Sequence, residues 1–180
     1  MQKNKSALFI LLSIILYFSV FFLQFRFSLD YAAFIFGGIV GLSFFWWEVL
    51  FYLFTLPRLE TESRQLKHLV QEKQFQSVLR FLQDQTNSQA LISRSLLFLG
   101  IYFVMAFFVI TSTGSPVGVG LILGLGLRYC LDIFLYRDHM NNLEKMYTQF
   151  GGFNLNDHLF SQLTKLFVIL FCVLSLLVLK

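Results

Sequence analysis

The stretch Pro116–Leu135, PVGVGLILGLGLRYCLDIFL, decides the fold class. Arg128 and Asp132 are its only charged residues. At 1.5 Å per residue, a helix of this length is about 30 Å long, which matches the hydrocarbon core of a bilayer. In lipid, the backbone polar groups of such a segment must be satisfied within the helix. The stretch therefore predicts a transmembrane α-helix.

The composition of the whole chain agrees with a lipid environment. The 180 residues are 57% hydrophobic and 18% aromatic, and only 13% are charged. A soluble domain would carry about 25% charged residues. The net charge is +4, but the basic residues lie at the ends of apolar runs instead of forming one stripe. We therefore expect one membrane domain over residues 1–180, with the lipid bilayer as its surroundings and no nucleic-acid partner.

Four more apolar segments surround this stretch, and together they predict an all-α integral membrane bundle of about five transmembrane helices. The expected spans are residues 7–25, 31–56, 93–112, 116–135 and 160–179. Between spans two and three, apolar residues recur at helical spacing, which predicts an amphipathic cytoplasmic helical hairpin over 57–87. Residues 136–158 are expected to form a second cytoplasmic segment, a loop with a short helix.

The basic residues also predict the orientation. With the amino terminus in the cytoplasm, eleven lie inside and two outside, which favours a multi-pass protein of the plasma (inner) membrane. The inside set is Lys3, Lys5, Arg58, Arg64, Lys67, Lys73, Arg80, Arg94, Arg137, Lys145 and Lys165, and the outside set is Arg26 and Lys180. No small-x-small cleavage site follows the first apolar run, so we interpret it as an uncleaved anchor.

Spans two and four share a pattern of two glycines four apart, then a carboxylate, then a tyrosine four residues later. The matching sets are Gly37, Gly41, Glu48 and Tyr52, and Gly120, Gly124, Asp132 and Tyr136. The pattern suggests a parallel repeat of two helical hairpins, with chance similarity as an equal alternative.

The paired glycines Gly37, Gly41, Gly120 and Gly124 are candidate helix-packing residues. Small residues four apart allow two helices to approach closely, so that van der Waals contact holds them together in lipid. The same motifs also form homodimer interfaces, and a homo-oligomer is therefore the alternative interpretation.

Glu48, Arg128 and Asp132 are ionisable residues inside the expected spans, and they form the candidate polar cluster. Arg128 and Asp132 are four residues apart on one helix face, and Glu48 is expected at the same depth, where Arg128 could pair with both carboxylates. One interpretation is a proton or cation site; the other, which we favour, is a structural ion pair, because no broken helix is expected beside it.

No pattern for catalysis, a cofactor or a metal is present. The glycines at 118–126 lack the Gly-Lys-Ser/Thr ending of a phosphate loop. His139 and His158 are nineteen residues apart without a nearby cysteine, so we interpret them as solvated side chains and expect no metal site. Cys130 and Cys172 are expected to be free thiols. Enzymatic activity is therefore not favoured, and no catalytic residue is assigned.

The segment Ile110–Ser115 followed by Gly120–Asp132, together with the acid-x-x-x-Tyr ending of span two and the basic amphipathic segment, resembles a family of small multi-span membrane proteins from genome-reduced candidate-phylum bacteria. This family often has a histidine where the present chain has Arg128. The resemblance implies a membrane protein and has no known activity to transfer.

These observations predict a non-enzymatic accessory or scaffold protein that presents the 57–87 hairpin to a soluble or membrane protein partner. The alternative is a small transporter or proton-coupled channel that uses Glu48, Arg128 and Asp132.

Overall fold

The computed structural model describes residues 2–21, 29–55, 60–72, 74–88, 91–135, 147–148 and 157–179, and within these ranges the structure is helical. In chain order the helices are α1 (Gln2–Val20), α3 (Leu29–Leu42), α4 (Phe44–Thr55), α5 (Glu60–Gln71), α6 (Phe75–Ser88), η2 (Ile92–Arg94), α7 (Leu96–Phe108), η3 (Val109–Thr113), α8 (Pro116–Leu135) and α10 (Asp157–Val178). The expected all-α fold class is therefore confirmed.

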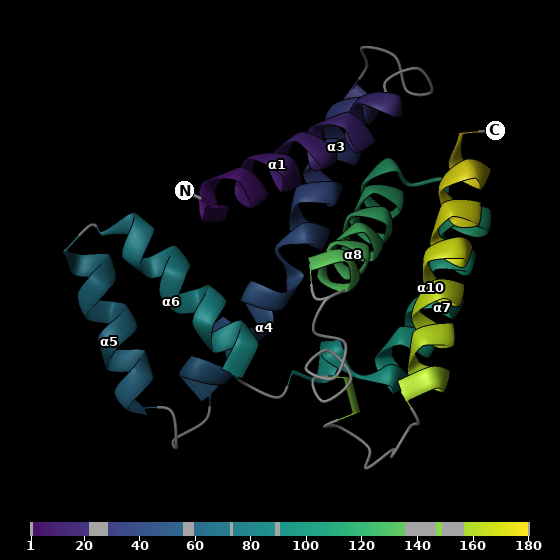
Figure 1. Cartoon of the computed structure of the whole chain (residues 1–180). Coiled ribbons are helices and arrows are strands. Elements are labelled where there is room, and N and C mark those ends of the chain that lie inside the picture. The colour runs from purple at the N-terminus through teal and green to yellow at the C-terminus, as the bar shows by residue number, and fades with distance from the viewer. Residues whose placement is uncertain are drawn as a thin grey trace.

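Helix α8 is the most buried helix, and its largest contact is with α3 (Figure 1). Glycines form this contact. A Cβ on Gly120 would overlap the carbonyl oxygen of Phe34, and a Cβ on Gly124 would overlap that of Gly38. On α3, a Cβ on Gly41 would meet the backbone at Leu121. The two backbones are thus in direct contact, which only glycine permits here.

The second expected span, residues 31–56, is not one straight helix. Helices α3 and α4 meet at Ser43 with a bend of 52°. The Ser43 hydroxyl donates to the carbonyl oxygens of Ile39 and Val40, and such bonds to the preceding turn bend helices. The expectation of an unbroken helix was therefore wrong, although the bent pair is apolar and long enough to form one span.

The third expected span begins at Leu96, where Ser95 is the N-cap and its hydroxyl accepts a hydrogen bond from the Phe98 amide. At the other end, the Thr111 hydroxyl donates to the Phe107 carbonyl within the widened turn η3. Gly114, with φ of 56°, then reverses the chain in a left-handed conformation that glycine adopts without strain. Pro116 follows in the first turn of α8, as the sequence predicted.

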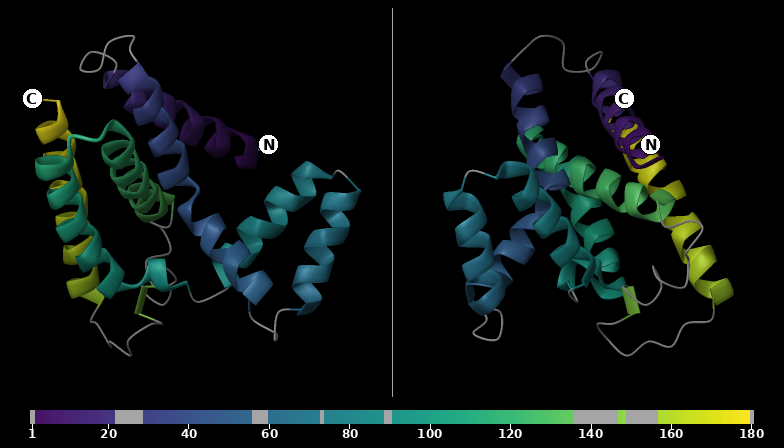
Figure 2. Two further views of the ribbon diagram at one scale, coloured as in Figure 1. Left: turned by 180° about the vertical axis from the view of Figure 1, so that it is seen from behind. Right: turned by 60° about the vertical axis from the view of Figure 1, so that its left-hand side comes forward.

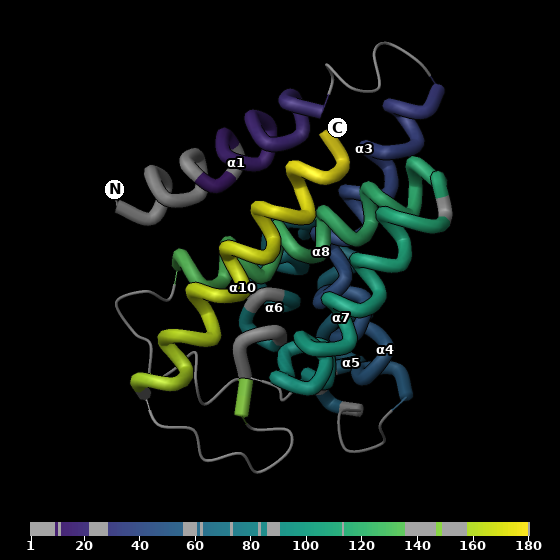
Figure 3. The backbone as a smooth tube through the Cα atoms, turned by 90° about the vertical axis from the view of Figure 1, so that its right-hand side faces the viewer, coloured from purple at the N-terminus to yellow at the C-terminus, as the bar shows by residue number. Residues whose placement is uncertain are grey.

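Helices α7 and α10 run side by side on one flank of α8 (Figure 2), with the Phe103 and Phe167 rings 5.0 Å apart. Helix α1 lies on the same side of the molecule as α10 (Figure 3), and the Tyr17 and Ser175 hydroxyls are 2.8 Å apart. Gly38 leaves room for the Phe18 ring, so α1 also packs on α3.

Helices α5 and α6 form a V-shaped hairpin beside α4, away from α7 and α10 (Figures 1 and 2). Leu66 and Leu82 are buried between the hairpin and the rest of the chain, and the Lys67 ammonium lies 5.7 Å from the centre of the Phe54 ring. These two amphipathic helices lie where the sequence predicted the hairpin.

Two helices in the described ranges, Pro116–Leu135 and His158–Val178, are long and apolar enough to cross a bilayer, and the bent α3–α4 pair would be a third. Leu96–Ser112 is apolar but shorter. Association with a membrane is therefore supported, whereas the count of five spans, the parallel repeat and the orientation stay predictions.

Candidate functional site: a charged junction

Polar side chains from α4, η2 and α8 meet at one place inside the bundle. We call it the charged junction, and it consists of Glu48, Ser93, Arg94, Arg128, Tyr129 and Asp132. Helix α4 contributes Glu48, the short segment before α7 contributes Ser93 and Arg94, and the last turns of α8 contribute the remainder.

The more deeply buried ion pair of the junction joins Arg94 to Asp132. An Nη2–H of Arg94 donates to Oδ2 of Asp132 over 2.8 Å, and both side chains are almost fully buried, with exposed fractions of 3% and 2%. Arg128 lies one turn before Asp132 on α8, and its Nη2 is 3.5 Å from Oδ1. One carboxylate therefore faces two guanidinium groups.

The Phe45 ring on α4 lies close to both arginines. Its ring centre is 5.0 Å from the guanidinium carbon of Arg94 and 5.5 Å from that of Arg128. Both distances are within the range of cation–π attraction, which strengthens where water is excluded. The first turn of α4 therefore contacts the same two arginines that pair with Asp132.

Glu48 binds the backbone of η2. Its carboxylate accepts the amide N–H of Ile92 over 2.7 Å and that of Ser93 over 3.2 Å, and it also accepts the Ser93 hydroxyl. The Tyr52 hydroxyl donates to the same carboxylate over 2.9 Å. Glu48 thus satisfies the free amide groups at the start of η2, where a negative charge is favoured.

Tyr129 closes the junction from α8, because its hydroxyl donates to the Ser93 carbonyl oxygen. The Tyr129 side chain is fully buried and its ring packs edge-on against Phe45 at 5.3 Å. Segment 92–95 is consequently held from α4 by Glu48 and from α8 by Tyr129 and Asp132.

The structure brings together Arg128 and Asp132 as the sequence suggested, but it places Glu48 against the η2 backbone. The cation that pairs most closely with Asp132 is Arg94, which sequence reasoning counted among the cytoplasmic loop residues. The sequence did contain a signal for this pair. Arg94 and Asp132 both lie at the cytoplasmic ends of their expected spans and therefore at similar depth.

Arg94 changes the charge of the site. Glu48 and Asp132 carry two negative charges, and Arg94 and Arg128 carry two positive charges, so the formal sum is zero. Without Arg94, the cluster of Glu48, Arg128 and Asp132 would carry one net negative charge, which would favour proton binding by one carboxylate. With Arg94 included, this excess does not arise. The geometry fits a buried ion pair that fixes one arrangement of three segments.

The four packing glycines all lie at the α3–α8 crossing, inside one chain.

The described residues hold no group of three or more histidine, cysteine or acidic side chains that could bind a metal. His158 is exposed in the first turn of α10, and both cysteines are free thiols. His139 and Tyr136 lie outside the described residues. Tyr136, the tyrosine of the second half-repeat, therefore cannot be compared with Tyr52.

Fold and site together define a helical protein with apolar, bilayer-compatible helices and an internally paired charge cluster. Comparison with models of known families, with characterised proteins and with solved structures found no match to this chain.

Proposed function

We propose that this protein is a non-enzymatic accessory or scaffold protein of the plasma (inner) membrane, with a cytoplasmic amino terminus, that presents the α5–α6 hairpin to a protein partner. The proposal assigns recognition to the hairpin and a supporting role to the charged junction.

One observation carries this proposal: the apolar residues at the tip of the hairpin are uncovered. Phe75 is 72% exposed, Val70 54% and Leu79 49%. Leu66 and Leu82, nearer the open end of the V, are buried. The hairpin therefore uses one part of its apolar surface to attach to α4 and leaves another part free. An amphipathic helix with free apolar anchors at i and i+4 is a common recognition element.

The residues on either side of position 73, at the hairpin tip, make local hydrogen bonds, which supports a display role. The amides of Glu72 and Gln74 donate to the carbonyl oxygens of His68 and Leu69, and the Gln74 side chain donates to Glu72. A preformed recognition element loses little conformational entropy when it binds.

Site-specific photo-crosslinking in native membranes tests the proposal. We expect p-benzoylphenylalanine in place of Phe75 or Leu79 to give one discrete protein adduct, because these side chains would lie in the interface. The same amino acid in place of Gln65, an exposed polar residue of α5, is the matched control and should give none. Adducts with lipid alone from Phe75, or identical protein adducts from Gln65, would contradict the proposal.

A small transporter is the second candidate, and the broken α3–α4 helix favours it. Interrupted helices often line transport sites, and Glu48 lies in the second turn of α4, just after the break. Glu48→Gln separates the two candidates. A scaffold keeps its Phe75 adduct with this substitution, whereas a transporter loses its flux and the pH dependence of that flux.

A further inference from the structure

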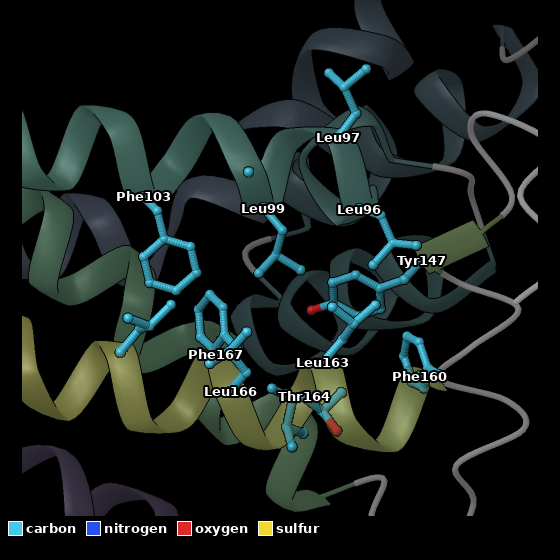
Figure 4. Close-up of a pocket in the computed structure, with 13 residues that line it drawn as sticks. Leu96, Leu97, Leu99, Phe103, Tyr147, Phe160, Leu163, Thr164, Leu166 and Phe167 are labelled. Carbon is cyan, nitrogen blue, oxygen red and sulfur yellow. The ribbon is translucent and has the colours of Figure 1, made fainter. Parts of the chain in front are cut away.

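A pocket lies between α7 and α10, away from the hairpin tip. One of its lining residues, Tyr147, also packs on Tyr129 of the charged junction, with ring centres 6.3 Å apart. Its volume is about 480 Å³, within the range of roughly 300–1,000 Å³ for small-molecule sites. Its walls are leucine and phenylalanine side chains (Figure 4), and Ile133 of α8 forms part of the lining. We call it the α7–α10 groove.

The groove is elongated along the two helices. On α7 its lining extends from Leu96 to Phe103, and on α10 from Phe160 to Leu170. At 1.5 Å per residue, the ten steps along α10 correspond to about 15 Å. This is half of the roughly 30 Å hydrocarbon core, and so the depth of one leaflet.

One end of the groove is polar because of Tyr147. This end lies at the amino termini of both helices, beside Leu96 and Phe160. Tyr147 is 2% exposed, and its hydroxyl has no hydrogen-bond partner among the residues that the structure describes. Figure 4 shows the hydroxyl turned toward Leu99. By contrast, the Thr164 hydroxyl in the same lining donates to the Ser161 carbonyl.

A buried hydroxyl without a partner is unfavourable, so the position calls for an acceptor. Burial raises the pKa of Tyr147 well above its usual value, which keeps the phenol protonated and able to donate. Neighbouring side chains cover the hydroxyl from water, so an acceptor would have to displace one of them to reach it.

We propose that the α7–α10 groove binds one ester-linked acyl chain of a bilayer glycerolipid, with the ester carbonyl oxygen accepting a hydrogen bond from Tyr147. The apolar wall takes the chain along one leaflet, and the ester lies at the boundary between hydrocarbon and headgroups, where the helices begin. Binding is thus independent of any partner of the α5–α6 hairpin.

Gly100 provides a variant that fills the groove without disturbing the fold. It lines the groove, and a side chain at this position would meet no atom within 4 Å. Gly100→Trp should therefore place an indole in the groove while α7 keeps its packing. Val104→Trp is the matched control, because Val104 is on the same helix, 72% exposed and outside the lining.

The test uses purified protein in nanodiscs that contain phosphatidylcholine with a diazirine in one acyl chain, with crosslinked positions mapped by mass spectrometry. We expect saturable labelling of groove residues in the natural protein and in Val104→Trp, and loss of this labelling in Gly100→Trp. Thermal melting of each variant reports whether it is folded.

Tyr147→Phe tests the polar end, because it removes only the hydroxyl. Unlabelled ester-linked phosphatidylcholine should compete for the groove about fivefold better than its ether-linked analogue, which lacks the carbonyl, since one hydrogen bond corresponds to a factor of this size. This preference should vanish in Tyr147→Phe. Non-saturable labelling that is equal at Val104 and in the groove, and unchanged by Gly100→Trp, would overturn the proposal in favour of bulk lipid contact.

Discussion

At the scale of single residues, Arg94 and Asp132 matter most, because both charges are removed from water. Separating two such charges leaves one of them buried without compensation, which is far more unfavourable than losing a surface pair. Asp132 would retain only Arg128, whose nitrogen is 3.5 Å away and whose side chain is 21% exposed. Replacing the pair by apolar residues of similar volume, however, leaves no orphaned charge.

We predict that Arg94→Met destabilises the folded protein by about 3 kcal/mol, and that Arg94→Met combined with Asp132→Leu restores most of this loss. Arg80→Met, on the exposed side of α6, is the control and should change stability by less than about 0.5 kcal/mol. Denaturant titration in mixed micelles gives the three free energies of unfolding. Additive losses in the double variant would show that the two side chains do not act as a pair.

Residue patterns identified part of this site, for a physical reason. Spacing of four on one helix brings Arg128 to Asp132, and sequence alone reveals such pairs. Glu48 and Arg94 are placed by the tertiary arrangement of η2, which depends on non-local contacts with Tyr129 and Phe45. Arg94 stands just before an apolar run, where a basic residue normally indicates the cytoplasmic side of a membrane. The sequence therefore could not distinguish a buried Arg94 from an exposed one.

At the scale of helices, the α3–α8 crossing organises the bundle, because lipid provides no hydrophobic drive between two apolar helices. Contact between glycine backbones replaces that drive, and it is made within one chain. The glycine spacing predicted the close approach but left open whether the partner was another helix of this chain or a second copy. The structure places an intramolecular partner at these glycines.

We predict that Gly120→Ala destabilises the protein by about 1–3 kcal/mol, because its methyl group would force α8 away from Phe34. Gly100→Ala, in open space on α7, should be neutral or stabilise by up to about 1 kcal/mol through higher helix propensity. Thermal melting in detergent compares the two, and light scattering checks the oligomeric state. A shift from oligomer to monomer in Gly120→Ala without loss of stability would instead indicate a homodimer interface.

Helix boundaries were predicted with uneven success. Residues 116–135 match α8, because a proline start and a continuous apolar run are local signals. The break at Ser43 was missed, because the hydroxyl bonds that bend the chain leave no trace in apolar periodicity. The third span was expected to begin at residue 93, but its helix begins at Leu96 with Ser95 as the N-cap, since η2 occupies Ile92–Arg94.

At the scale of the whole molecule, the arrangement divides into two parts with different surfaces. The helices α1, α7, α8 and α10 with the bent α3–α4 pair carry long apolar faces, whereas the α5–α6 hairpin is amphipathic and rich in exposed polar residues. Such a division fits a bundle in lipid with one water-facing recognition element. Composition and periodicity predicted this division. The number of spans and the orientation are defined relative to a bilayer and stay predictions.

The most direct test of this account is cysteine accessibility in intact cells. In a background with Cys130→Ala and Cys172→Ala, single substitutions Ser115→Cys, before α8, and Gln76→Cys, in the hairpin, report the two expected sides of the membrane. We predict that a membrane-impermeant maleimide labels position 115 before lysis and position 76 only after lysis. Labelling of both positions before lysis, or protection of both until lysis, would contradict the proposed arrangement.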